Sequence, residues 1–188
     1  MNLQNLLDKY NIKIDINTVL GMWSESHRHF HNLDHLNDLI SQINEKYFND
    51  KISEKIKDKL TLVALFHDII YDPKSNQNEE KSAELFLSSC QEKNNPDVKE
   101  VYQAILDTKS HQSTTKLSEA FNQMDMNIVE RDFRSLLEWE QGIYEEYKIF
   151  GIKEYKKGRL KFLESILDKY THNTENLLKL IDYVRDNY

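Results

Sequence analysis

Cysteine is almost missing from the chain: Cys90 is the only one in 188 residues, so no internal disulfide can form, and with no acid or base motif beside it this thiol is expected to be inert. Proline and glycine are scarce too, with two and four copies, which favours long helices joined by short loops. The longest apolar run, around Leu62 to Phe66, falls far short of the roughly 20 residues that cross a bilayer. These shortages exclude a disulfide framework and a helical membrane protein.

Positive charge is also in deficit. The chain carries 25 Lys and Arg against 32 Asp and Glu, a formal net charge of −7. Nucleic-acid duplexes and anionic membranes repel such a chain at long range, so neither is expected as a partner, and an anionic substrate must be held locally. Residues Met1 to Asn5 lack the basic and apolar regions of a signal peptide, and a cytoplasmic location is expected.

Helical periodicity runs through most of the sequence. The length suits one domain with a sizeable core, and we expect an all-α fold of about seven to nine helices over residues 1–188. Its motif core would cover about 23–130 and its C-terminal helices about 131–188. Ser53 is the expected N-cap of the helix before His67, and Asn76 or Asn78 that of the next helix.

Histidines are concentrated in one place, since four of the seven lie between His27 and His35. His31 and His35, four residues apart, share one side of the start of a helix. Apolar residues at helical spacing lead to His67, which places its imidazole in the core. Burying a polar group without a partner costs roughly 2–7 kcal/mol. A backbone carbonyl can offset that cost, with Asp68 turned to solvent, and so can a metal ion.

Four residues near helix ends or in turns offer a mixed set of imidazole and carboxylate donors: His35, His67, Asp68 and Asp125. Such a set suits Mn, Fe, Zn or Ni and, less well, Mg, and Asp68 has two oxygens that can bridge a second ion. A divalent ion lowers the pKa of a coordinated water, which then attacks a phosphorus centre near neutral pH. One or two ions are therefore expected.

The order of these residues resembles a known signature. His35, then His67-Asp68 after 31 intervening residues, then Asp125, is similar to the H…HD…D pattern of the HD-domain superfamily of metal-dependent phosphohydrolases. That resemblance implies these four residues as metal ligands in a single HD-type domain. From about Trp23 to Leu167 the chain also looks like small bacterial members called predicted metal-dependent HD phosphohydrolases, in Arg28–His35, Ala64–Pro73, Asn78–Ala83 and Gly158-Arg159.

The chain departs from that group near Asp125, where Gln123 stands in place of a second acidic residue. If that residue supports the ligands from outside, its loss weakens metal affinity by about 10–100-fold. The stretch Phe30–His35 is also similar to the YHNxxH stretch of cyclic-nucleotide phosphodiesterases. There the second histidine binds metal and the first protonates the leaving oxygen, which implies His31 as general acid; the pKa of an unperturbed imidazole, about 6.5, suits proton donation at neutral pH. Phe30 replaces the tyrosine, so a phenol hydroxyl is lost.

Three basic residues are the candidates for contact with a substrate phosphate near the motif histidines: Arg28, Lys81 and Lys109. Arg28 ranks first because a guanidinium holds phosphate through two parallel hydrogen bonds. The alternative for Arg28 is a surface ion pair with Glu25.

Two further residues also have two interpretations. Glu79 follows the metal motif closely and can orient the attacking water, or it can complement a helix dipole. His111 can contact substrate phosphate or a second ion, or it can complete a helix cap.

The leading hypothesis is a metal-dependent phosphohydrolase acting on a small phosphoester, a nucleotide being the favoured class. A di-iron oxygenase of the HD superfamily is the alternative from another enzyme class; such enzymes look to have two extra histidines before the last aspartate, and here only His111 is present. A non-catalytic nucleotide-binding module is the third reading, which the intact ligand set disfavours. Substrate, metal and oligomeric state stay open, a homo-oligomer included.

Overall fold

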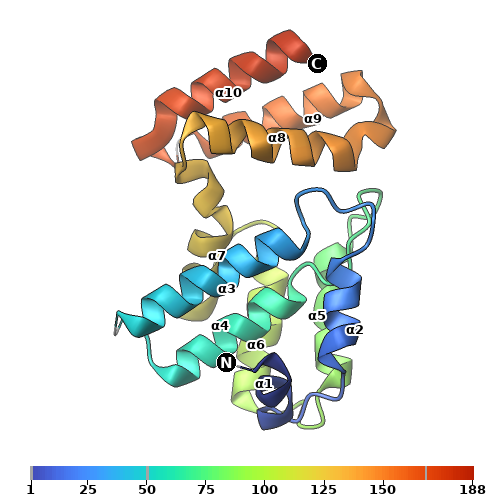
Figure 1. Cartoon of the computed structure of the whole chain (residues 1–188), viewed down its shortest axis with the longest axis vertical. Helices are drawn as coiled ribbons and strands as arrows, with labels where there is room; N and C mark the ends of the chain where they lie inside the picture. The colour runs from blue at the N-terminus through green and yellow to red at the C-terminus, as the bar shows by residue number, and fades with distance from the viewer. Residues whose placement is uncertain (1, 50, 168) are drawn as a thin grey trace. The chain divides into compact units, whose positions relative to one another are not determined.

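Ten α-helices and three short 3₁₀ helices make up the described part of this computed structural model, residues 2–49, 51–167 and 169–188 (Figure 1). Over these ranges the extended backbone pairs in one isolated bridge, between Ile12 and Cys90, and no named strand forms. The all-α class is confirmed. No helix in the described ranges is both long and apolar enough to cross a membrane.

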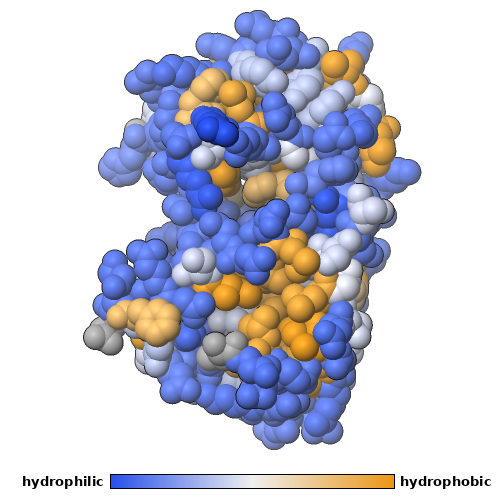
Figure 2. Space-filling view, in the orientation of Figure 1, coloured by the Kyte–Doolittle hydropathy of each residue, from blue (hydrophilic) through white to orange (hydrophobic). Residues whose placement is uncertain are grey.

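The chain divides into two compact units, Met1–Asp125 and Met126–Tyr188. The first contains α1 (Leu3–Lys9), α2 (Ile16–Trp23), α3 (Leu33–Phe48), α4 (Glu54–Phe66), α5 (Asn78–Ser89), α6 (Pro96–Asp107) and α7 (Lys116–Asp125). The second contains η1 (Met126–Glu130), α8 (Phe133–Tyr147), η2 (Lys148–Phe150), α9 (Ile152–Ile166), η3 (Thr171–Asn173) and α10 (Thr174–Asn187). On the face shown in Figure 2, hydrophilic residues cover most of each unit, and apolar residues appear in both units, the larger part of those in the first unit in one patch.

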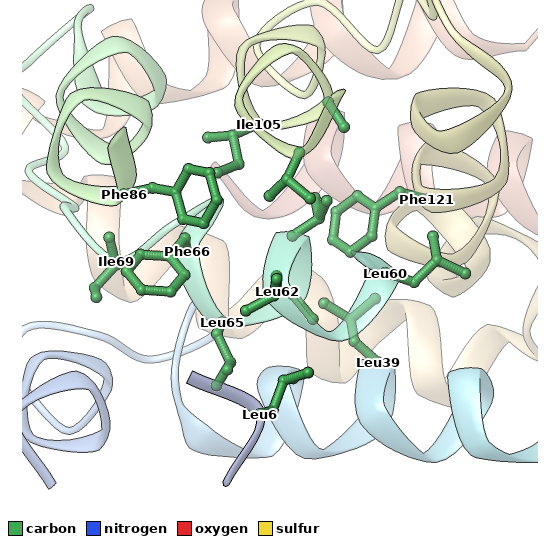
Figure 3. Close-up of a cluster of buried hydrophobic side chains, with 14 of the residues drawn as sticks. Leu6, Leu39, Leu60, Leu62, Leu65, Phe66, Ile69, Phe86, Ile105 and Phe121 are labelled. Carbon is green, nitrogen blue, oxygen red and sulfur yellow. The ribbon is translucent and has the colours of Figure 1, made fainter. Parts of the chain in front are cut away.

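Helix α4 forms the centre of the first unit. Its residues from Lys57 to Phe66 are all buried, and it packs against α3, α5, α6 and α7. Figure 3 shows Leu62 and Phe66 of this helix among side chains from several others, including Phe86 and Phe121. A helix surrounded on all sides places whatever follows its last turn inside the protein, and here that is His67.

The helix termini correct two expectations. Ser53 caps α4 as predicted, since its side chain accepts a hydrogen bond from the backbone N–H of Ile56. The prediction that Asn76 or Asn78 caps α5 is wrong: the N-cap is Gln77. The side chain of Asn78 instead bonds both backbone polar groups of Asp72, at 2.9 and 3.1 Å, and so closes the loop after α4.

The structure has ten α-helices in its described ranges, more than the expected seven to nine, and α7 is one that the helical pattern of the sequence does not mark clearly. Its start carries a reciprocal cap, in which the Thr115 hydroxyl accepts from the backbone N–H of Ser118 and the Ser118 hydroxyl accepts from that of Thr115, each at 3.0 Å. Leu117, Phe121 and Met124 then fall on one buried face. This helix delivers Asp125 as its last residue.

Candidate metal centre

The first unit brings together the four residues that the signature named. His35 lies in the first turn of α3, His67 and Asp68 follow the last turn of α4, and Asp125 ends α7. The Nε2 atom of His35 lies 3.1 Å from Oδ1 of Asp125, and Nε2 of His67 lies 3.2 Å from Oδ2 of Asp68 and 3.6 Å from Oδ1 of Asp125. One donor atom each of His35, His67 and Asp68 fall within 4.8 Å of one another. The group has the size of a metal site.

The orientation of His67 shows which ring nitrogen is available. Its Nδ1 lies 3.1 Å from the carbonyl oxygen of Ala64, and a carbonyl only accepts, so Nδ1 carries the proton. In the neutral ring Nε2 therefore presents a lone pair toward two carboxylates. Among the described residues, Nε2 of His67 and Nε2 of His35 are both buried without a hydrogen-bond partner. A cation between these nitrogens and the carboxylates would satisfy all of them.

This geometry confirms the expected burial of His67 and contradicts the expected exposure of Asp68. His67 is 1% exposed, as its place on the helix predicted, and it does bond a backbone carbonyl. The idea that Asp68 turns to solvent is wrong, because its side chain is only 14% exposed and faces His67.

The charges of the group are strongly coupled. Burial alone would lower the pKa of His67, but the neighbouring carboxylates of Asp68 and Asp125 outweigh it and raise that pKa to about 10. Burial alone would raise the pKa values of Asp68 and Asp125, yet the histidines beside them hold both below their ordinary value. Both carboxylates are therefore ionised at neutral pH, and without a metal ion His67 holds a proton beside them, which a bound cation would replace.

Aromatic rings enclose the two ligand histidines. The ring centroids of Trp23 and Phe121 lie 5.5 and 5.0 Å from that of His67, and Phe30 lies 5.0 Å from His35. Such rings exclude water, and in the resulting environment of low dielectric constant electrostatic interactions are stronger. Sequence analysis does not single out Trp23 as part of the site; its position just before the histidine-rich stretch is the signal that could have found it.

His111 also contacts the centre. Its Nε2 lies 3.2 Å from Oδ2 of Asp125, the oxygen opposite the one that faces His35. The backbone of His111 has φ 51°, and the loop around it is held by Asp107, whose Oδ2 accepts from the N–H and the hydroxyl of Thr114, each at 2.8 Å. The imidazole of His111 therefore bonds a candidate ligand rather than capping α6. Its contact with a substrate or a second ion stays a prediction.

His31 lies beside the centre, with its ring centroid 4.5 Å from that of Tyr71 and 6.1 Å from that of His35. Its charge is one of the causes that lower the pKa of Asp68. The residue is half-buried, so its ring is close to the candidate ligands and still reaches solvent. This placement fits proton transfer to a group bound at the centre, and the general-acid role stays a prediction.

The prediction that Arg28 binds a phosphate does not fit the structure. The side chain is fully buried, and its guanidinium donates to the carbonyls of His31, Asp68 and Ile69 and to the carboxylate of Glu25. These contacts, 2.8 to 3.1 Å long, engage every nitrogen of the group. The pair with Glu25 was foreseen, but not at the surface, and no donor remains for a substrate.

The other predicted contacts lie on or near α5. Lys109 donates to the carboxylate of Glu80 and, at 2.5 Å, to the carbonyl of Asn76, so it ties the end of α6 to the start of α5. Lys81 is exposed, and Glu79 is half-buried in the first turn of α5. In the described ranges neither side chain takes part in a hydrogen bond or an ion pair. Their roles toward a substrate stay predictions.

A polar groove of about 610 Å³ lies at the other end of α4. There Lys9 pairs with Asp58 at 2.7 Å and with Glu54 at 3.3 Å, and Lys55 pairs with Asp97 at 2.9 Å. Asp58 precedes His67 by roughly 14 Å along the helix axis, at about 1.5 Å per residue. The groove is separate from the metal centre.

The assignment of this group as a candidate metal centre is based on the residues of the chain itself. Comparison of the sequence and structure with protein-family models, curated proteins and solved structures finds no match.

Proposed function

We propose that this chain is an HD-type, metal-dependent phosphohydrolase that cleaves a small phosphoester, with a nucleotide as the favoured substrate class. One observation carries the proposal: two buried imidazole nitrogens without hydrogen-bond partners among the described residues face two ionised carboxylates. Once His67 has released its proton, two neutral imidazoles and two carboxylates carry a charge of −2, which one divalent cation cancels. The resemblance of the motif order to the HD signature agrees with this donor set.

The residues that would hold the ion are His35, His67, Asp68 and Asp125. Two of them are already oriented by a second contact, since His67 donates to the Ala64 carbonyl and Asp125 accepts from His111. When bound, a divalent cation lowers the pKa of a coordinated water and polarises the phosphoryl group.

His31 would supply the proton in this reaction. Water adds to phosphorus, the phosphorus–oxygen bond to the leaving group breaks, and the protonated imidazole of His31 donates its proton to the departing oxygen. The rings of Tyr71 and Phe30 both pack against His31, with centroids 4.5 and 5.0 Å away. These rings restrict the imidazole to one place beside the candidate ligands.

Metal content tests the proposal directly. Mass spectrometry on protein purified without chelator should find Mn, Fe, Zn or Ni in near-stoichiometric amount, and Asp68→Ala should lose both metal and phosphoester hydrolysis. The matched control is Asp34→Ala, an exposed aspartate of α3 next to His35, which should keep both. A parent protein that is empty and takes up neither Mn²⁺ nor Mg²⁺ would overturn the proposal in favour of a binding module.

A di-iron oxygenase is the second candidate, and one observation favours it. His111 adds a third imidazole beside Asp125, so that each oxygen of that carboxylate faces a different histidine. Two irons per chain in the same metal measurement, with no hydrolysis across a phosphoester panel, would support the oxygenase.

A further inference from the structure

Arg28 connects two segments that are far apart in the sequence. Its Nη1 lies 3.0 Å from the carbonyl oxygen of His31 and 2.8 Å from that of Asp68, and its Nη2 lies 3.0 Å from the carbonyl oxygen of Ile69. The guanidinium is centred 5.4 Å from the ring of Trp23 and 5.3 Å from that of Tyr71. A planar group in such a site cannot shift without breaking several contacts.

These contacts supply hydrogen-bond donors to buried backbone carbonyls at and just after the end of α4. The last carbonyls of a helix have no partner inside the helix, and a buried one must find a donor elsewhere. Trp23 donates its indole N–H to the carbonyl of Leu65 at 2.9 Å, and His27 donates to that of Tyr71 at 2.8 Å. Arg28 bonds the carbonyls of Asp68 and Ile69, two of the five between Leu65 and Tyr71, just beyond the last residue of α4, and its charge complements the negative end of the helix dipole.

We propose that Arg28 is a positioning residue that fixes His31, the candidate general acid, relative to Asp68, a candidate metal ligand. One nitrogen, Nη1, bonds the carbonyls of both residues, so it sets the distance between the two backbone segments. The inference rests on the proposed function for its catalytic consequence. A displacement of about 1 Å in a catalytic group can cost about 100-fold in rate, so a loosened Arg28 contact should slow the reaction without removing the ion.

The test compares Arg28→Lys with Glu25→Gln. Lysine keeps the charge but lacks the planar fork, so it cannot reach all three carbonyls at once. Arg28→Lys should keep the parent metal content while kcat falls about 10- to 100-fold with KM nearly unchanged, the pattern of a lost transition-state geometry. Glu25 is half-exposed, and its carboxylate contacts Nε and Nη2 of the guanidinium but not Nη1, which bonds the His31 and Asp68 carbonyls, so Glu25→Gln should keep the parent kcat. Arg28→Met is the stronger variant, and Arg28→Lys keeps the test valid if Arg28→Met does not fold.

A second measurement does not depend on activity. Amide hydrogen exchange on the metal-loaded protein should show residues 28–32 and 66–71 exchanging faster together in Arg28→Lys, with the rest of the first unit unchanged. Faster exchange in only one segment, an unchanged kcat, or loss of metal in Arg28→Lys would each overturn the proposal. A metal-loaded parent that hydrolyses no phosphoester would instead overturn the proposed function, while the exchange data would still decide whether Arg28 joins the two segments.

Discussion

Each of the two units buries a charged cluster, and the clusters differ in how completely they are paired. In the second unit Glu140 is fully buried, and its two oxygens accept from Arg159 at 2.6 Å and from Tyr155 at 2.5 Å. Arg159 also lies over the ring of Trp139, at 4.1 Å, although its Nη2 has no hydrogen-bond partner among the described residues. One negative charge there faces one positive charge.

The first unit lacks such a balance. Asp68 and Asp125 are two carboxylates, and the nitrogens that face them are imidazole lone pairs unless a proton or a cation intervenes. The comparison teaches that burial of charge alone does not indicate a site: the Glu140 cluster is explained by its own partners, whereas the histidine cluster has more carboxylates than fixed positive charges and is therefore the candidate for a bound cation.

Removing His31 should give the largest effect and should separate catalysis from structure. His31→Ala should lower the hydrolysis rate by about 10²–10⁴-fold, the range for loss of a general acid, while metal content stays at the parent level. Steady-state kinetics beside metal analysis measures both. His172→Ala, which removes an exposed histidine of the second unit, is the control. Loss of metal in His31→Ala would show that His31 is a ligand instead.

Breaking the Glu140 pair should affect folding and leave the metal in place. Glu140→Ala leaves Arg159 buried without its carboxylate, which should cost about 3–5 kcal/mol of unfolding free energy. Denaturant unfolding with metal analysis on the folded protein tests this, and Tyr155→Phe, which removes one hydrogen bond to a charged group, should cost about 1.5–3 kcal/mol. A Glu140 variant that is stable but loses metal would contradict the conclusion that the Glu140 cluster is structural and the histidine cluster is the one that binds metal.

The pH dependence of metal binding should follow from the proton on His67. Its folded pKa of about 10 exceeds the ordinary 6.5, so in metal-free protein its contribution to stability is complete below about pH 6.5 and is lost as the pH rises through 10. Metal binding requires the unprotonated nitrogen, so one proton leaves and affinity should rise about tenfold per pH unit below the folded pKa. Calorimetric Mn²⁺ titrations in buffers of different ionisation enthalpy count that proton, and an affinity independent of pH would contradict the assignment.

The sequence predicted the centre better than its surroundings, for a physical reason. Helical spacing located His67 in the core, and the signature added His35, Asp68 and Asp125 because ligand chemistry restricts residue type at each position. No such restriction on partners applies to Arg28. A guanidinium can donate hydrogen bonds to phosphates and to carbonyls, and its actual partners depend on where α4 ends in space.

The fold shows the same limit. All-α composition follows from the scarcity of glycine and proline. Helix α7 was missed because its signal is local and short: a reciprocal cap between Thr115 and Ser118, followed by one buried face. Asn78 resembles an N-cap in the sequence. In the structure its side-chain amide instead hydrogen-bonds the backbone of Asp72, in the loop after α4.

The smallest expected effect concerns His111, which tests how far the unpaired cluster extends. His111→Ala removes the contact to Oδ2 of Asp125 but none to the other candidate ligands. If His111 only orients Asp125, metal affinity should fall by about 10–100-fold while the stoichiometry stays at the parent value, because the four ligands remain. Competition with a fluorescent chelator measures the affinity, and Ser110→Ala, an exposed neighbour in the same loop, is the control. A fall from two ions per chain to one would instead show that His111 is a ligand of a second ion. The metal-binding cluster would then include the loop after α6.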